Sequence, residues 1–367
     1  MTLRGAVALI GIGEVKPERR MDGRTALGLA AQAARECIAD SGLRKDEVDG
    51  LITEIPTGNP TVLADYLGIR PVYSTGVQMM GASGATSIAT AAAAIHAGLA
   101  SNVLCVVGGP APGGEHGGGP GAPDYRRQQF DAPYGPVVAA NGGYALIAQR
   151  YKYEFGTTDE QRAAVAVQQR FNALANPAAV FYGQPITKDD VLNSRVVADP
   201  LRLLECVMPV GGAAAVIVSA ADRARYSPHP PVYLLGAGMC VDHDAIPYAP
   251  TMTTSPVAVS ARRAFAMAEL GPRDMDMLSI YDCYTITVII CLEDAGFAPK
   301  GEGGAFIEST DVTYRGTLPL NTHGGQLSFG QPGLAGGMSH VVESVRQMMG
   351  RGGERQVRDL DYCFVNG

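Results

Sequence analysis

The sequence predicts an α/β fold built from two similar halves. Apolar, strand-like runs alternate along the chain with helix-like stretches, and this alternation is typical of α/β proteins. The same order of elements occurs twice, first from Gly5 to about Ser219 and again from Val232, which indicates a duplicated unit. We therefore expect an N-terminal half at residues 1–225 and a C-terminal half at 226–367, which a chain of 367 residues is long enough to form.

The elements of the first half follow one another between glycine-rich turns. The apolar run from Ala6 to Ile12 predicts the first strand. Apolar residues at helical spacing from Leu27 to Ile38 predict a helix, with Asp22 as its candidate N-cap. The other expected elements are a strand ending DEVDGLITEI (46–55), an Ala-rich helix at 85–97 opened by the turn GASG (81–84), and strands in NVLCVVGG (102–109) and GGAAAVIVSA (211–220).

The second half repeats this plan. The stretch PVYLLGAGM (231–239) predicts its first strand, and SPVAVSARRAFAMAELG (255–271) predicts a helix with Ser255 as cap and Pro256 at its first position. The later elements are an acidic turn and strand in PRDMDMLSIYD (272–282), a glycine turn entering a helix in GGQLSFGQPGLAGGMSHVVESVRQMMG (324–350), and the start of a last strand in YCFVNG (362–367).

Residues from about 109 to 200 do not fit the repeat. They contain a glycine-rich stretch and then helical sequence near 141–155 and 158–175. An insertion of this size on an α/β frame is typical of a lid or a substrate-binding cap, with a surface loop and added helices as the alternative. Phe130, Phe171 and Phe181 lie in it, and we expect them to favour a bulky acyl group.

Composition limits the classes of function. A net charge of −7 gives no basic footprint for nucleic acid, and no unbroken apolar run of about 18 residues predicts a membrane span. The seven cysteines include no Cys-x-x-Cys pair, which favours reduced thiols and a cytoplasmic protein. The apolar N-terminus is interpreted as a strand, not as a signal peptide. No cluster of His, Cys, Asp or Glu has metal-ligand spacing.

The order of four stretches resembles the sterol-carrier-protein-type branch of the thiolase superfamily. These stretches are VQMMGASGATSIATAA (77–92), DMDMLSIYDCYTITVIICLEDAGF (274–297), GTLPLNTHGGQLSFGQPGLAGG (316–337) and HVVESVRQMMGRGGERQV (340–357). The resemblance covers nearly the full chain. It implies two βαβαβαββ halves in a five-layered αβαβα arrangement, CoA as part of the substrate with no tightly bound cofactor, and a homodimer.

All three catalytic positions depart from the family pattern. The family's nucleophilic cysteine is replaced by Gly81, which has no side chain to attack a thioester. The second motif reads YDCY, with Tyr281 in place of the usual histidine, and the third reads GQP, with Gln331 in place of a histidine. This pattern resembles the steroid side-chain aldolases of the same branch, which place a tyrosine at the position of Tyr281.

The residues that remain suit retro-aldol cleavage of a β-hydroxyacyl-CoA, which needs no nucleophile. It needs a base for the β-hydroxyl proton, an oxyanion site for the thioester enolate, and an acid to quench that enolate. Tyr281 is the candidate base or proton relay, if its pKa is lowered or if water assists. The amide of Gly81 is a candidate oxyanion donor, Gln331 offers an NH₂ donor, and Asp282 is a candidate for orienting Tyr281.

The glycine-rich turn of the third motif supplies further candidates. Asn321 and His323 are expected at the catalytic site, and Ser255, Gly324 and Gly325 are expected to contact CoA. No metal is expected.

Two other functions stay open. An acyltransferase could make carbon–carbon bonds by Claisen chemistry with a displaced nucleophile such as Cys283 or Cys363, and a non-catalytic subunit could bind CoA or lipid. The resemblance also implies a small partner protein with a zinc ribbon and an OB-fold. We expect the homodimer to form through the strand after Gly68, because the apolar residues 71–80 would otherwise be exposed.

Overall fold

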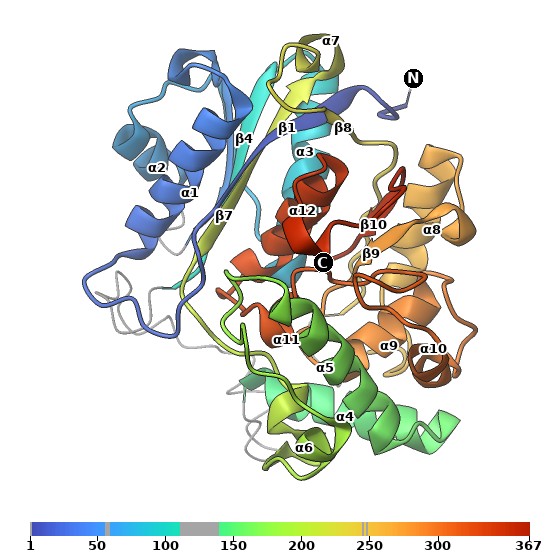
Figure 1. Ribbon diagram of the computed structural model, residues 1–367. Helices are drawn as coiled ribbons and strands as arrows, with labels where there is room; N and C mark the ends of the chain where they lie inside the picture. The colour runs from blue at the N-terminus through green and yellow to red at the C-terminus, as the bar shows by residue number, and fades with distance from the viewer. Residues whose placement is uncertain (1, 56–58, 111–138, 244–245, 247–248) are drawn as a thin grey trace.

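The chain alternates strands and helices as predicted, and the computed structural model describes residues 2–55, 59–110, 139–243, 246 and 249–367 (Figure 1). A six-stranded sheet has the order β3-β2-β4-β7-β1-β8. Its strands are β1 (Val7–Glu14), β2 (Gly50–Glu54), β3 (Tyr73–Gly76), β4 (Asn102–Gly108), β7 (Ala213–Ala220) and β8 (Val232–Tyr233). β2 is parallel to β3 and β4, whereas β7 is antiparallel to β4 and β1.

The central strands of this sheet are buried because both of its faces are covered. β1, β2, β4 and β7 are nearly continuous apolar runs, as strands covered on two faces are. Helices α1 (Ala26–Ser41) and α2 (Pro60–Leu67) pack on one face, and α3 (Ser83–His96) and α12 (Ala335–Met348) on the other (Figure 1). Gly13 allows the close approach of α1, since a Cβ there would lie 2.6 Å from the backbone nitrogen of Cys37.

A second, smaller layer of strands lies beyond α12. The strands β9 (Met277–Ser279) and β10 (Cys363–Val365) form a parallel pair, and α8 (Val257–Ala268) and α9 (Thr285–Asp294) cover its far side. The rings of Phe265 on α8 and Phe364 on β10 stack with centroids 5.4 Å apart. The order α1/α2, large sheet, α3/α12, β9/β10, α8/α9 gives the five predicted layers (Figure 1).

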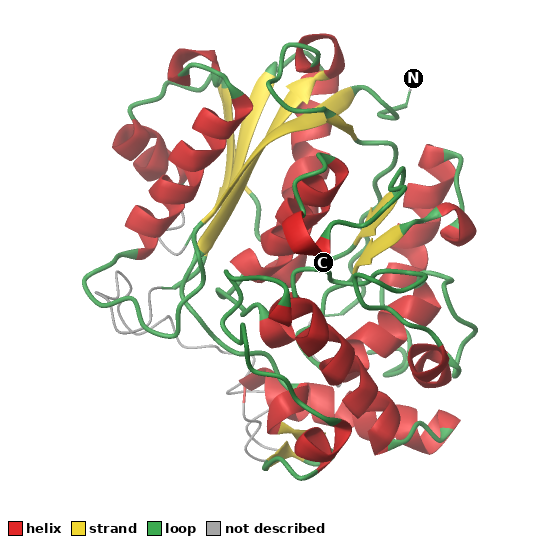
Figure 2. Cartoon of the chain, in the orientation of Figure 1, coloured by secondary structure: helices red, strands yellow, loops and turns green. Residues whose placement is uncertain are grey.

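The second half has fewer regular strands than its predicted βαβαβαββ plan. Among the described residues the strands lie in the large sheet, the β9/β10 pair and a short β5/β6 ladder (Figure 2). Most of the expected strand 231–239 is irregular because its glycines lie against α8: a Cβ at Gly238 would be 2.8 Å from the carbonyl carbon of Ser260. Its first residues form β8, which pairs with β1 in the large sheet. The division at 225/226 stays a prediction.

The insertion forms a helical layer below the two sheets in Figure 1. Its elements are α4 (Ala139–Phe155), α5 (Asp159–Leu174), α6 (Lys188–Leu192), β5 (Val196–Ala198) and β6 (Leu201–Arg202). Phe171 stacks on Tyr314 and Phe181 lies under the guanidinium of Arg170, and the preference for a bulky acyl group stays a prediction. Phe130 lies outside the described residues. The remaining helices are α7 (Ala221–Ala224), α10 (Gly303–Ser309) and α11 (Gly325–Ser328).

Two predicted helix caps are wrong. The side chain of Thr25, not Asp22, accepts a hydrogen bond from the backbone of Gly28 and caps α1. The side chain of Ser255 instead donates to the carboxylate of Asp294 at 2.9 Å, so it ties the start of α8 to the end of α9. Asp22 lies too far before α1, which begins at Ala26, to cap it, whereas a tertiary hydrogen bond to Asp294 takes up the side chain of Ser255.

A buried ionic cluster joins α12 to the end of β1. Glu343 is fully buried and accepts hydrogen bonds from Arg355, Arg346 and Thr322. Arg346 also reaches Glu14 at the end of β1, with 3.1 Å between the charged groups. Burial opposes the ionisation of Glu343, but the ion pairs with Arg355 and Arg346 prevail and hold its pKa below the usual range. Residues far apart in the sequence are therefore fixed around one carboxylate.

Candidate active site

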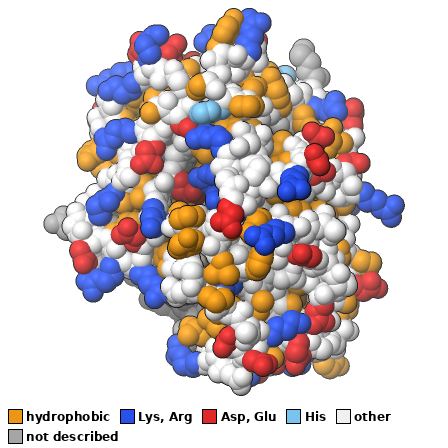
Figure 3. Space-filling view, viewed as in Figure 1, with side chains coloured by type: hydrophobic (Ala, Val, Ile, Leu, Met, Phe, Trp, Pro, Cys, Tyr) orange, Lys and Arg blue, Asp and Glu red, His pale blue; other side chains and the backbone are white. Residues whose placement is uncertain are grey.

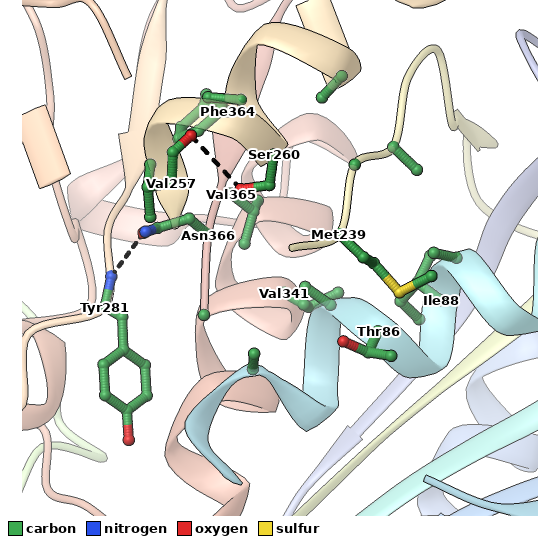
Figure 4. Close-up of a pocket in the computed structure, with 18 of the residues that line it drawn as sticks. Thr86, Ile88, Met239, Val257, Ser260, Tyr281, Val341, Phe364, Val365 and Asn366 are labelled. Atoms are coloured by element: carbon green, nitrogen blue, oxygen red, sulfur yellow. Dashed lines mark hydrogen bonds between the residues drawn. The ribbon is translucent and has the colours of Figure 1, made fainter. Parts of the chain in front are cut away.

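Tyr281 follows the end of β9, and its ring lies against the turn that leads into α3. Its backbone N–H donates to Oδ1 of Asn366 at 2.9 Å, and Asn366 in turn donates from its own backbone N–H to Ser279. The ring points away from Asn366 toward the start of α3 (Figure 4). The C-terminal end of a strand in an α/β protein is the usual place for functional side chains.

The phenol ring of Tyr281 occupies the space that a side chain at position 81 would need. Gly81 lies in the 3-10 turn Met80–Ala82, directly before α3. A Cβ atom built on Gly81 would lie 2.5 Å from Cε2 of Tyr281, and closer still to Cζ and to the hydroxyl oxygen. Carbon atoms in contact are about 3.5–4.0 Å apart. A cysteine at position 81 and the observed placement of Tyr281 are therefore sterically incompatible.

Gln331 lies on the other side of the same hydroxyl group. Its Nε2 donates to the Tyr281 hydroxyl oxygen at 3.2 Å. The backbone of Gln331 is itself held by two hydrogen bonds, from its N–H to Met208 at 2.8 Å and from Val210 to its carbonyl at 3.0 Å. Gly81, Tyr281 and Gln331, which are far apart in the sequence, thus meet around one phenol oxygen.

The hydroxyl of Tyr281 is a protonated phenol at neutral pH. Burial raises its pKa, the nearby Cys283 and Asp282 raise it further, and hydrogen bonding by Gln331 and Gln326 opposes the rise without reversing it. The lowered pKa that would make Tyr281 a phenolate base is therefore not what the structure shows. Because Gln331 donates to the phenol oxygen, the O–H of Tyr281 is left to donate to another group.

A cavity of about 740 Å³ adjoins this group and includes Gly81 and Tyr281 in its wall. Its wall is mostly apolar, with Ile88 of α3, Val341 of α12 and Met239 among the residues that line it (Figure 4). A cavity of this volume is in the range of small-molecule sites. Ser255, a predicted CoA contact, also lines the cavity, as does Tyr144 of α4, which the sequence did not single out.

Asp282 is fully buried and does not contact the Tyr281 hydroxyl. Its Oδ1 accepts from the backbone N–H of Gln326 at 2.8 Å and its Oδ2 from that of Leu327 at 3.1 Å. Its third partner is Nε2 of His340, 3.1 Å from Oδ1. Asp282 thus ties the strand end to α11 and α12.

The side chain of Asn321 makes its hydrogen bonds to the backbone, and a catalytic role for Asn321 stays a prediction. Its side-chain amide accepts from the N–H of Ile280 and donates to the carbonyl of the same residue, both at 2.8 Å. Its φ of 51° is in the left-handed region, which Asn adopts more readily than most residues. The group of Gly81, Tyr281 and Gln331 therefore forms without the side chain of Asn321, which holds Ile280, the residue before Tyr281.

His323 is buried behind the site. Burial lowers its pKa, with the neighbouring His340 in the same direction, so the ring is neutral. Its centroid is 5.1 Å from that of His340 and 5.0 Å from that of Phe329. Neither ring nitrogen has a hydrogen-bond partner among the described residues. His323 does not line the cavity, and a catalytic role for it stays a prediction.

Gly324 and Gly325 are required by packing. Both have positive φ, and a Cβ at Gly324 would lie 2.7 Å from that of Ala173, whereas one at Gly325 would lie 2.5 Å from Oε1 of Gln169. Neither lines the cavity, and the contacts of these glycines with CoA stay predictions.

The two cysteines considered as displaced nucleophiles differ in exposure: Cys283 is buried, whereas Cys363 is partly buried and lines the cavity. Burial raises the pKa of Cys283 to about 11 and that of Cys363 to about 12. The thiolate is the nucleophilic form of cysteine, and these environments suppress it. Cys283 contacts the hydroxyl of Thr287 at 3.4 Å, so it fills the core of α9.

Sequence reasoning missed Gln326 and His340, which lie beside Tyr281. Both are completely buried polar residues, and each lies within a stretch that carried the family resemblance. The signal available in the sequence was their position: Gln326 directly follows the paired glycines, and His340 occurs among apolar residues of a helix. A histidine among apolar residues more often fills a core, and only the fold shows that this one faces Asp282.

Comparison with known proteins finds relatives that match nearly the full chain. Residues 238–367 match a family model described as thiolase C-terminal domain-like. The chain is 33% identical to an acetyl-CoA acetyltransferase of Methanothermobacter thermautotrophicus, over 97% of the chain and 94% of that protein. It is 34% identical to a steroid side-chain-cleaving aldolase of Thermomonospora curvata, over 95% and 91%. It is 33% identical to a 17-hydroxy-3-oxo-4-pregnene-20-carboxyl-CoA lyase of Mycobacterium tuberculosis, over 95% and 92%.

A solved structure has the same fold along the whole chain. The structure of an Ltp2-ChsH2(DUF35) aldolase superposes with a TM-score of 0.91 at 32% identity and covers 100% of this chain and 95% of that one. No helix within the described residues is long and apolar enough to cross a membrane.

Proposed function

Because this chain belongs to the thiolase superfamily and has its predicted thiolase-like α/β fold, we propose that it cleaves a β-hydroxyacyl-CoA by a retro-aldol reaction without a covalent acyl-enzyme. Two of its relatives are named as an aldolase and a CoA lyase. The observation that carries the proposal is the phenol of Tyr281, which fills the side-chain space at Gly81 and hydrogen-bonds to Gln331.

Tyr281 supports the one proton transfer that this reaction requires. When the bond between the α- and β-carbons breaks, its electron pair stays on the α-carbon as the thioester enolate. The β-hydroxyl loses its proton to leave a carbonyl, and the α-carbon gains one. A neutral phenol accepts a proton on its oxygen as it donates its own, so it relays the proton from the β-hydroxyl to the α-carbon. Its raised pKa suits this concerted role, because no free phenolate forms.

The enolate oxygen needs hydrogen-bond donors while the carbon–carbon bond breaks. We assign this role to the backbone amide of Gly81, which lies beside the phenol in the turn that leads into α3. The N-terminal end of a helix favours negative charge, and donors fixed before the reaction stabilise a developing oxyanion. The large apolar cavity next to Gly81 suits the acyl chain, and Ser255 on its wall is a proposed contact for CoA.

Replacing Tyr281 by phenylalanine tests the relay. Tyr281→Phe removes one hydroxyl and no ring volume, and we expect a loss of kcat of roughly 10²–10⁴-fold, the usual size of a general acid–base contribution. Binding of CoA and thermal unfolding should change little. Tyr314→Phe is the matched control, because Tyr314 is buried in contact with Phe171 and does not line the cavity. Full turnover by Tyr281→Phe would rule out the relay.

We also propose a homodimer formed through β3. This strand pairs only with β2, so among the described strands its outer edge is open. Val72, just before β3, is 80% exposed and Met80, after it, is 66% exposed. Open edges and exposed apolar side chains are typical of an interface. Light scattering at micromolar concentration should give the mass of two chains, and a stable monomer would contradict the proposal.

A small zinc-ribbon/OB-fold protein is the second proposed partner. The similar solved structure, Ltp2-ChsH2(DUF35) aldolase, carries the name of a DUF35 component beside the aldolase. Charged residues of both signs are interspersed over the face in Figure 3, so the partner is not expected to bind this face by charge alone. Co-expression followed by a pull-down tests the proposal, and recovery of this chain alone would weaken it. The seven free thiols support a reducing, cytoplasmic location.

A further inference from the structure

Three separate segments meet at the carboxylate of Asp282. The first is the end of β9, which carries Tyr281 and Asp282 in succession. The second is α11, whose Gln326 and Leu327 donate backbone N–H groups to the carboxylate. The third is α12, whose His340 places Nε2 3.1 Å from Oδ1. The side chains of Asp282 and His340 are both 0% exposed, so water does not compete for these bonds.

This carboxylate links the strand end that carries Tyr281 to α11, which precedes Gln331, while Met208 and Val210 hold the backbone of Gln331 itself. Tyr281 directly precedes Asp282 in the chain, and Gln331 follows α11 by three residues. We therefore expect a shift of α11 relative to the strand end to disturb the 3.2 Å bond between Gln331 and the phenol oxygen. Gly325 keeps the approach close, because any Cβ there would overlap the carboxylate of Asp282.

The hydrogen bond to Asp282 fixes the tautomer of His340. An ionised carboxylate only accepts hydrogen bonds, so Nε2 of His340 carries the proton that it donates. The other nitrogen, Nδ1, is buried and has no partner among the described residues. Leaving a polar atom unpaired costs free energy, which an apolar side chain on this face of α12 would avoid. The hydrogen bond from Nε2 to Asp282 offsets this cost.

The ring of His340 also lies next to the site itself. Its centroid is 6.2 Å from that of Tyr281 and 5.1 Å from that of His323. The amide nitrogen of Gln326 is 3.5 Å from Nε2 of His340. His340 thus packs against Tyr281, and it donates a hydrogen bond to Asp282, the residue that follows Tyr281.

We propose that His340 is a positioning residue that acts through Asp282 to hold the Tyr281 phenol between Gly81 and Gln331. The inference rests on the proposed retro-aldol function for its kinetic consequence. The placement itself does not depend on that function.

A pair of amide variants tests the inference. His340→Gln puts an amide nitrogen near the place of Nε2 and keeps the donor to Asp282, whereas His340→Asn carries the same amide on a shorter side chain that does not reach it. We expect His340→Asn to lower kcat by about 10–100-fold, the usual effect of losing an outer hydrogen bond to a reacting residue, with KM changed less than about threefold. His340→Gln should recover kcat to within about threefold of wild type.

A double-variant cycle shows whether the effect passes through Asp282. In the Asp282→Asn background, His340→Asn should cost little more, because the interaction it removes is already altered. Equal losses for His340→Gln and His340→Asn would overturn the inference, as would additive losses in the cycle. So would a folded His340→Asn variant with wild-type kcat. Thermal unfolding of each variant reports whether it is folded.

A readout that needs no turnover separates this inference from the proposed function. 3-Fluorotyrosine placed at position 281 gives a ¹⁹F resonance that reports on the surroundings of the phenol. We expect the resonance to move in His340→Asn and to stay near its wild-type position in His340→Gln. If wild-type protein cleaves no β-hydroxyacyl-CoA, the proposed function fails and this spectrum still decides the placement. An unmoved resonance in His340→Asn would overturn the inference even in an active enzyme.

Discussion

Replacing Gly81 by alanine adds one methyl group in the space that the phenol of Tyr281 occupies. The new Cβ would lie 2.5 Å from Cε2 of Tyr281 and closer to Cζ. Carbon atoms in contact need about 3.5 Å, so the ring must retreat by about 1 Å or more. That retreat disturbs the 3.2 Å hydrogen bond from Gln331. Overpacking of this kind costs about 1–3 kcal/mol of stability, and a misplacement of about 1 Å at a reacting group costs on the order of 10²-fold in rate.

Initial rates of β-hydroxyacyl-CoA cleavage and thermal unfolding measure these two effects. Gly271→Ala is the matched control, because Gly271 has a negative φ and the nearest atom to a Cβ there is 3.8 Å away. Tyr281→Ala supplies a second check. In that background Gly81→Ala should cost little further stability, since the ring that it meets is gone. Wild-type rate and wild-type stability in Gly81→Ala would refute the steric argument.

Three further predictions concern the phenol of Tyr281, the carboxylate of Glu343 and the thiols of Cys283 and Cys363. Because burial raises the pKa of Tyr281 and the protonated phenol is the active form, kcat should stay level from neutral to moderately alkaline pH. A pH–rate profile that rises with a single ionisation through that range would indicate a phenolate base instead. Glu343→Gln should lower the unfolding free energy by about 3–5 kcal/mol at pH 7. Because folding lowers the pKa of Glu343, its contribution to stability is present above the pKa of the unfolded chain, near 4.5, and is lost as pH falls through the pKa of the folded chain. Denaturant titrations should therefore give converging unfolding free energies for the two proteins in acid. Intact-mass spectrometry after incubation with an activated acyl-CoA should show no acyl group on the protein, because the pKa values of Cys283 and Cys363 are raised and both thiols are protonated; a stoichiometric adduct on either would favour the acyltransferase.

The sequence was sufficient for the plan of the fold and for the central group of the site. Alternating apolar runs and turns predict the strands and helices, since each is a local pattern. The quoted motifs place Gly81, Tyr281 and Gln331 together through their resemblance to a known family. The family pattern also shows that a glycine replaces the nucleophile.

The remaining features depend on contacts between distant segments. The steric exclusion between Gly81 and Tyr281 is invisible in a sequence that separates them by 200 positions. The side chain of Asn321 bonds to the backbone, and that of Asp282 bonds to two backbone N–H groups and to His340, which only coordinates reveal. The apolar residues of the glycine-rich stretch after β8 predict a strand, but close packing of this stretch against α8 prevents regular pairing with another strand.

The most direct test of the account is to incubate the purified chain, with its proposed partner present, with a panel of β-hydroxyacyl-CoA thioesters and no added CoA. Mass spectrometry then follows all products. The account predicts one aldehyde or ketone and one shortened acyl-CoA for each substrate molecule consumed, without any need for free CoA. Products that appear only after free CoA is added, with the acyl group transferred to it, would contradict the account.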